Sequence, residues 1–194
     1  MLAYLLWHWP LPDTDVSAYE QAMIDFHRSL AAAQPAGFLE STGFRSSGVP
    51  WAASGGPTYE DWYLLEGSAA MDILNDLAVS GDSKIHHDTA AGAVEAASAG
   101  LYTLRVGSAD LAAARACAWL AKPRGMTYQN FFASIEPWTS AGDVAVLRRQ
   151  MVLGPTPEFC LLSPQQLDLP ASMGAVHCRL APVSGSRFGV SRSV

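Results

Sequence analysis

The chain has 194 residues, of which 49% are hydrophobic and only 15% charged, so it can bury a sizeable core. Its formal net charge of -6 comes without any basic stripe, which argues against nucleic acid as a partner. The apolar residues 2–9 are too few to span a membrane and lack the basic start and cleavage site of a secretory signal. We therefore expect a cytoplasmic protein with no membrane partner, and a homo-oligomer is left open.

The first half of the chain predicts the order strand, helix, strand, strand, helix, strand. Residues 2–9 form an apolar strand that Pro10 ends. Ser17 and Glu20 have the spacing of a capping box at the start of the first helix, and His27 is expected at its margin. The apolar stripe of this helix comprises Val16, Tyr19, Met23, Phe26 and Leu30. The later elements are strands over 38–45, 61–66 and 101–106, a short helix over Met71, Leu74 and Leu77, and an alanine-rich helix within 81–99 that Asp88 can cap.

The second half predicts the same order in fewer residues. Thr127 can cap its first helix, which carries Phe131 on the apolar face. Gly154 and Pro155 give a tight turn, and the polar tail is expected either to be loose or to pack as an arm. The remaining elements are strands over 116–122, 143–153, 157–163 and 175–180 and a short helical connection over 164–173.

A long loop and three cysteines complete the pattern. Residues 46–58 form a glycine- and proline-rich loop around Trp51, whose length suggests a lid, with a tolerated surface insertion as the alternative. Cys117, Cys160 and Cys178 are odd in number and include no CxxC pair, so we expect neither a disulfide framework nor a structural zinc site. All three lie in apolar runs, where a free cysteine acts as a small hydrophobe.

The two halves also share sequence. The segment that starts Pro57-Thr58 and reaches Leu64-Leu65 has a counterpart that starts Pro155-Thr156 and reaches Leu161-Leu162, and residues 101–106 are matched by 175–180. A repeat of this length indicates one folding unit used twice. The expected units are 1–107 and 116–182, each a β-α-β-β-α-β or ferredoxin-like unit, followed by a tail over 183–194.

With this order in both halves, the aromatic strand Trp62-Tyr63-Leu64-Leu65 and the later stretch His86-His87-Asp88, the chain resembles the dimeric α/β-barrel superfamily. Its members include antibiotic-biosynthesis monooxygenases, stress-responsive barrel proteins and chlorite-dismutase-like proteins. The resemblance implies an α+β fold in which two antiparallel ferredoxin-like sheets pack as a barrel within one chain, with a cavity between them. It transfers no catalytic residue, because no motif matches residue by residue.

The repeat provides the first candidate site. Arg105 and Arg179 fall at matching places in the last strand of each half, as do Thr103 and His177. Alternation puts Thr103 on the same strand face as Arg105, and His177 on the same face as Arg179. Two guanidinium groups suit a carboxylate, phosphate or enolate, and His177 is a candidate general acid or base. The ordinary alternative is that both arginines reach solvent near strand ends.

A second candidate lies in the first strand. Alternation places Trp7 and Trp9 on one face as walls for a planar ligand and His8 on the other as a polar contact. The alternative is aromatic packing with His8 hydrogen-bonded. His86 and His87 diverge by about 100° on a helix, so we expect no metal site there, and a helix start capped by Asp88 is favoured.

Function is open among three hypotheses. The leading one is a barrel protein that binds a small, partly apolar and anionic molecule between its two sheets. The second is a monooxygenase-like or haem-handling enzyme with His8 or His177 as base or ligand, so haem is left open although no cofactor is predicted. The third is a non-catalytic structural or oligomer-forming protein whose cavity is filled by its own tryptophans and tyrosines.

Overall fold

A computed structural model describes residues 1–52, 56–150 and 156–189. Its strands are β1 (Leu2–Pro10), β2 (Phe38–Ser47), β3 (Thr58–Leu65), β4 (Val94–Val106), β5 (Ala116–Leu120), β6 (Ala145–Arg149), β7 (Phe159–Ser163), β8 (Val176–Pro182) and β9 (Phe188–Gly189). Its helices are α1 (Val16–Ala33), α2 (Ser68–Ala78), α3 (Gly81–Gly92) and α4 (Tyr128–Thr139), with a 3-10 turn over Ala171–Met173. No helix in the described part of the chain is long and apolar enough to cross a membrane.

Eight of the strands close into an antiparallel barrel. Their order is β3-β1-β4-β6-β7-β5-β8-β2, and β2 pairs back with β3 to complete the ring. The order contains β4-β1-β3-β2 from the first half and β8-β5-β7-β6 from the second, so each half has the ferredoxin-like strand order. The α+β fold with two ferredoxin-like units in one barrel is therefore confirmed. The expected turn at Gly154-Pro155 lies outside the described residues.

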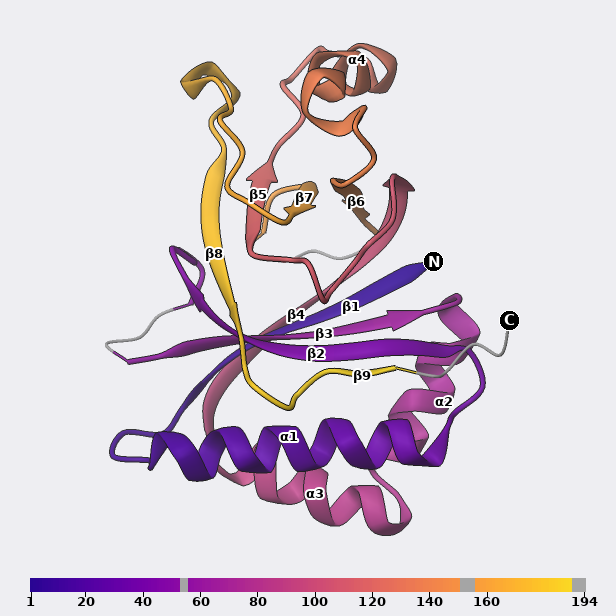
Figure 1. Ribbon diagram of the computed structural model, residues 1–194, viewed down its shortest axis with the longest axis vertical. Coiled ribbons are helices and arrows are strands. Elements are labelled where there is room, and N and C mark those ends of the chain that lie inside the picture. The colour runs from indigo at the N-terminus through magenta and orange to yellow at the C-terminus, as the bar shows by residue number, and fades with distance from the viewer. Residues whose placement is uncertain (53–55, 151–155, 190–194) are drawn as a thin grey trace.

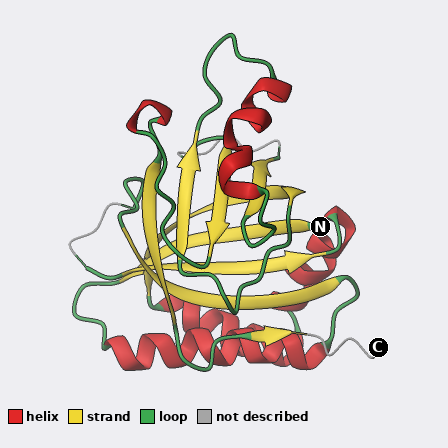
Figure 2. Ribbon diagram, turned by 45° about the horizontal axis from the view of Figure 1, so that its top comes forward, coloured by secondary structure: helices red, strands yellow, loops and turns green. Residues whose placement is uncertain are grey.

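The helices cover the outside of the barrel unevenly. Helices α1, α2 and α3 lie together against the outer face of the first-half strands, whereas α4 lies alone over the second-half strands at the far end (Figures 1 and 2). The C-terminal segment runs back along the first half, where β9 pairs with β2 and the Ser186 hydroxyl donates to carbonyl oxygens of Gly43 and Val183. The tail was expected either to be loose or to pack as an arm, and its described part packs as an arm.

Large aromatic side chains fill the inside of the barrel. Trp7, Trp62 and Trp119 are fully buried there, and the rings of Trp7 and Trp119 meet edge to face at 5.4 Å. Trp51, from the loop after β2, adds its ring at 5.6 Å from Trp7. Three free, buried cysteines occupy the same core: Cys117, Cys160 and Cys178. The space between the two sheets is thus an aromatic core, in contrast to the ligand cavity expected there.

The cap of the first helix lies two residues before the predicted one. Asp15, with extended backbone, caps α1 by accepting a hydrogen bond from the Ala18 N–H at 2.7 Å, so Ser17 is already helical. Glu20 does not close a capping box, because its carboxylate binds the Arg45 guanidinium and accepts from the Tyr59 hydroxyl at 2.9 Å. Thr127 caps α4 as predicted, by accepting from the Asn130 N–H at 3.2 Å.

The alanine-rich segment is shorter as a helix than its composition predicts. Helix α3 ends at Gly92, and β4 starts at Val94, where it runs alongside β1. Pairing with a strand outweighs the helical preference of alanine here, because it satisfies the backbone of both strands. Asp88 is not a cap but lies inside α3, where it contacts Lys84.

Glu60 gives the fold a testable pH dependence. Its side chain is fully buried in the barrel, and one carboxylate oxygen accepts from the Trp62 Nε1–H at 3.2 Å. Burial raises the pKa of Glu60 from 4.5 to about 7. The folded protein therefore holds a proton that the unfolded chain releases, so stability should fall as pH rises from about 4.5 to 7.

We expect Glu60→Gln to remove this pH-dependent loss of stability. The loss is on the order of 3 kcal/mol for a pKa that rises from 4.5 to about 7. Urea unfolding of both proteins across this pH range measures it. A stability difference between variant and wild type that does not change with pH would contradict the assignment.

Candidate functional site

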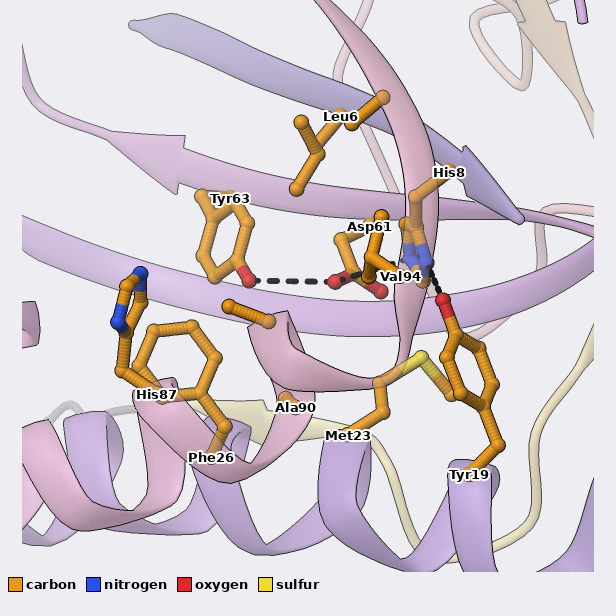
Figure 3. A pocket seen from close by; sticks show the side chains of 12 residues that line it. Leu6, His8, Tyr19, Met23, Phe26, Asp61, Tyr63, His87, Ala90 and Val94 are labelled. Carbon is orange, nitrogen blue, oxygen red and sulfur yellow. Dashed lines mark hydrogen bonds and ion pairs between the residues drawn. The ribbon is translucent and has the colours of Figure 1, made fainter. Parts of the chain in front are cut away.

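A partly open cavity lies between the outer face of the first-half sheet and the helices α1 and α3. It has a volume of about 210 Å³. Its walls are mostly apolar, and its polar side chains come from β1, β3, α1 and α3 (Figure 3). The lining includes Leu6, Met23, Phe26, Ala90 and Val94 among the apolar residues and His8, Tyr19, Asp61, Tyr63 and His87 among the polar ones.

Asp61 is the centre of the polar part. It lies on β3, is 4% exposed, and contacts two imidazoles: His8 Nε2 at 3.3 Å and His27 Nε2 at 3.1 Å. These contacts are ion-pair contacts rather than aligned hydrogen bonds. The Tyr63 hydroxyl also reaches the Asp61 carboxylate, at 3.4 Å. One buried carboxylate thus holds three polar side chains in place.

The two histidines extend this arrangement in opposite directions. His8 Nδ1 lies 2.5 Å from the Tyr19 hydroxyl, which faces the cavity. His27 is fully buried, and its Nδ1 lies 2.8 Å from the Ser41 hydroxyl. Figure 3 shows His8 between the Tyr19 hydroxyl and the Asp61 carboxylate. The order carboxylate, imidazole, hydroxyl is the order by which an enzyme activates a hydroxyl group.

The ionisation of these groups follows from their surroundings. Burial acts to raise the pKa of Asp61, but His27 and His8 outweigh it and hold this pKa well below its ordinary value. Burial, with Asp61 nearby, raises the pKa of Tyr19 and of Tyr63. Asp61 is therefore ionised and both tyrosines are protonated at neutral pH. The Asp61 carboxylate faces His8 Nε2, so the tautomer with its proton on Nε2 leaves Nδ1 to accept from the Tyr19 hydroxyl.

The second half lacks this site at the matching position. Trp7 pairs with Glu60, and Trp119, which occupies the same place in the second half, pairs with Cys160. The residues that correspond to His8, Tyr59 and Asp61 are accordingly Leu120, Phe159 and Leu161, and all three are buried in the apolar core under α4. The polar cluster is therefore specific to the first half and is not a requirement of the fold.

The candidate residues of β1, Trp7 and His8, lie on opposite faces of the sheet. His8 faces the cavity, as described, whereas Trp7 points into the barrel. Trp9 is 9% exposed and borders a different surface hollow beside Leu11 and Val16. Alternation along this strand was predicted correctly for Trp7 and His8. The aromatic neighbours of His8 are Tyr19 and Tyr59, at ring distances of 5.7 and 5.6 Å, instead of the two tryptophans.

The repeat-based candidates do not meet. Arg105 lies on β4 and Arg179 on β8, and three strands separate β4 from β8 in either direction around the barrel. Both side chains are exposed. Arg179 borders an outer hollow with Arg45 and Arg115. His177 is half-buried and pairs with Ala118, which faces α4.

The strand register explains why the repeat misled. Thr103 on β4 pairs with Arg148 on β6, and Ala181 on β8 pairs with Arg45 on β2. Arg45 in the first half is the structural equivalent of Arg148 in the second half. Thr103 therefore corresponds to Ala181. It follows that Arg179 corresponds to Leu101, four positions away from the place of Arg105.

Sequence reasoning missed Asp61, Tyr63 and Tyr19 as site residues and placed His27 at a helix margin. Two signals were available. Asp61 is a carboxylate inside an aromatic strand without a neighbouring cation in the sequence. Tyr19, Met23 and His27 follow one another at intervals of four, which puts His27 on the buried helix face.

The resemblance leaves haem open, and the lining residues can be tested against it. Of the two histidines that line the cavity, His8 has both ring nitrogens within contact distance of a side chain, and His87 is half-buried at the edge with Nδ1 3.2 Å from Asp88 Oδ1. The volume of 210 Å³ is also below the roughly 300–1,000 Å³ of sites for drug-sized ligands. The residues present do not fit a porphyrin. In the described part of the chain no group of three or more His, Cys, Asp or Glu is placed to hold a metal ion.

Comparison with known proteins gives the fold a name. No family model and no curated protein matches the sequence. Among solved structures, the chain is similar to a proposed monooxygenase from Fusobacterium nucleatum subsp. nucleatum, with 10% identity, a TM-score of 0.67, and 97% of this chain and 94% of that chain covered. An anthrone oxidase-like protein has 8% identity and a TM-score of 0.58, with 100% of this chain and 94% of that chain covered. A proposed monooxygenase from Lactobacillus acidophilus NCFM has 9% identity and a TM-score of 0.59, with 97% of this chain and 96% of that chain covered. At these identities the likeness concerns the fold, and the chain has the fold of the dimeric α/β-barrel superfamily.

Proposed function

We propose that the chain is an acid–base enzyme of the oxidase or monooxygenase type. Its substrate is a small, largely apolar molecule with one acidic O–H or C–H group, bound in the cavity under α1 and α3. The observation that carries the proposal is the buried Asp61 carboxylate between two histidines at an apolar cavity, in a position that the second half fills with Leu161. A buried, charged cluster is costly, so its presence at a cavity favours a functional role.

The cluster is arranged to take up a proton. The Tyr19 hydroxyl accepts a proton from the bound substrate as it passes its own to His8 Nδ1. The imidazolium that forms is stabilised by Asp61, which His27 and Tyr63 hold in place. The substrate is left as an electron-rich anion in an apolar space, where few water molecules compete for it.

Dioxygen is the oxidant in this proposal. For an activated CH₂ group, two C–H bonds break and one C=O bond forms, so that R₂CH₂ and O₂ give R₂C=O and H₂O. The carbon loses four electrons and dioxygen gains four. The resemblance to an anthrone oxidase-like structure supports this class of substrate.

Anthrone, of which one end would enter the cavity while the rest extends through its open side, provides the test together with dissolved oxygen. We expect wild-type protein to accelerate oxygen uptake with anthrone above the uncatalysed rate. His8→Leu, which introduces the residue that the second half has at this position, should lower the acceleration by about 10²- to 10⁴-fold, the usual contribution of general acid–base catalysis. Arg105→Leu, remote from the cavity and exposed, is the matched control and should behave as wild type.

The result that counts against the proposal is equal oxygen uptake by wild type and His8→Leu. Failure of anthrone and of simple phenols to raise the thermal midpoint of the wild type would also count against it, because a ligand of the native state stabilises that state.

A further inference from the structure

A second cavity adjoins the first one on the same face of the sheet. It has a volume of about 150 Å³ and lies under α2, between this helix and the sheet. None of its lining residues is Asp, Glu, Lys or Arg. The residues that line it but not the first cavity include Tyr4, Leu30, Met71, Leu74, Ala78 and Val79.

The two cavities share one wall. Leu6, Phe26, Tyr63 and His87 line both of them. The rings of Phe26 on α1 and His87 on α3 meet edge to face at 5.5 Å, and both side chains are only half-buried. Phe26 and His87 are side chains of two different helices at this shared wall, so rotation of their rings would change the width of the division between the cavities.

The polar cluster lies away from this division. Figure 3 shows Phe26 and His87 together at one end of the first cavity, with Tyr19 and His8 toward the other end. A substrate whose acidic group contacts Tyr19 and His8 therefore directs its opposite end toward Phe26 and His87.

We propose that the second cavity is a subsite for an apolar tail of the substrate, with Phe26 and His87 as the gate between the two compartments. This inference rests on the proposed function, because the acidic group fixes the orientation. The substrate class is then a hydroxylated aromatic ring with an apolar substituent opposite the hydroxyl group. An apolar cavity of about 150 Å³ is large enough for one benzene-sized group, so the tail holds about four to six carbons.

Phenol and 4-butylphenol are probes that differ only in the tail. Each methylene that is removed from water contributes about fourfold in affinity, so we expect 4-butylphenol to bind the wild type at least tenfold tighter than phenol. Titration calorimetry gives both dissociation constants.

Two alanines allow the compartments to be filled one at a time. Ala78 lines the second cavity only, and Ala90 lines the first only. Ala78→Leu should abolish the tenfold gain of the butyl group and leave the phenol constant within twofold of wild type. Ala90→Leu should weaken both ligands together. Ala78→Val, with a smaller side chain than leucine, should leave an intermediate affinity gain from the butyl group. Thermal melts check that each variant is folded.

The outcomes separate the subsite from the function. A butyl gain that is absent in wild type, or that survives unchanged in Ala78→Leu, overturns the tail subsite. If the butyl gain depends on Ala78 but wild type and His8→Leu take up oxygen with anthrone at equal rates, the subsite stands and the proposed function fails. If 4-butylphenol responds to Ala90→Leu and not to Ala78→Leu, the tail lies in the first compartment and the inference is wrong.

Discussion

Replacement of Asp61 by alanine should lower the free energy of unfolding by about 3–5 kcal/mol, the usual cost of removing one partner from a buried ion pair. The variant leaves His8, His27 and the Tyr63 hydroxyl buried without their shared carboxylate. Because the pKa of Asp61 is lowered in the folded state, its contribution is fully present near neutral pH, begins to fall below the ordinary range of an aspartate, and is lost as pH passes the lower pKa of the folded state.

Urea unfolding at pH 7 and at pH 3 measures this effect. Asp88→Ala is the matched control, because Asp88 also contacts a histidine, His87, but is exposed on α3. We expect the control to change stability by less than about 1 kcal/mol. A similar small effect at Asp61 would mean that the cluster contributes little to the fold, and a loss independent of pH would place the cause in packing.

Phe131→Ala should also lower the free energy of unfolding by about 3–5 kcal/mol. Phe131 is 4% exposed, and its ring lies 4.3 Å from that of Phe159 in the core under α4. The sequence places Phe26 on the equivalent apolar stripe of α1 and predicts the same loss. In the structure Phe26 is half-buried and borders the two cavities, so Phe26→Ala should cost clearly less than Phe131→Ala.

The comparison of the two variants is direct, because the side chain removed is the same. Denaturant midpoints and slopes for both proteins give the two free energies. Equal losses would show that Phe26 is as tightly packed as Phe131, and would remove the basis for a gate beside His87.

The fold could be predicted because strands with both faces apolar and a repeated element order have few solutions. A ferredoxin-like sheet covered by helices on one face needs a second sheet on the other. The site was harder, because it depends on contacts between distant segments. Asp61 meets His8 only because β1 pairs with β3, and it meets His27 only because α1 packs on that pair. Of the candidate site residues, His8 is the one that lines this cavity, and the alternation of its strand placed it on the face opposite Trp7.

The repeat was informative about topology and misleading about residues. The shared Pro-Thr segments align Glu60 with Glu158, whereas the strand register aligns Glu60 with Cys160. A shift of two keeps the strand face and therefore leaves the apolar pattern intact. The match of the last strands is wrong by four residues, another even number that keeps the strand face, so Arg105 and Arg179 appeared to be equivalent.

Closure of the barrel by two halves of a single polypeptide has a thermodynamic consequence. A barrel assembled from separate subunits loses its interface on dilution, because association depends on concentration. Here the β4–β6 and β2–β8 seams are intramolecular, so each half meets the other at a high effective concentration that dilution does not change. Mutation can also alter one half without imposing the same change on the other. A polar cluster around Asp61 and a dry core around Leu161 can therefore coexist in one molecule, which identical subunits could not achieve.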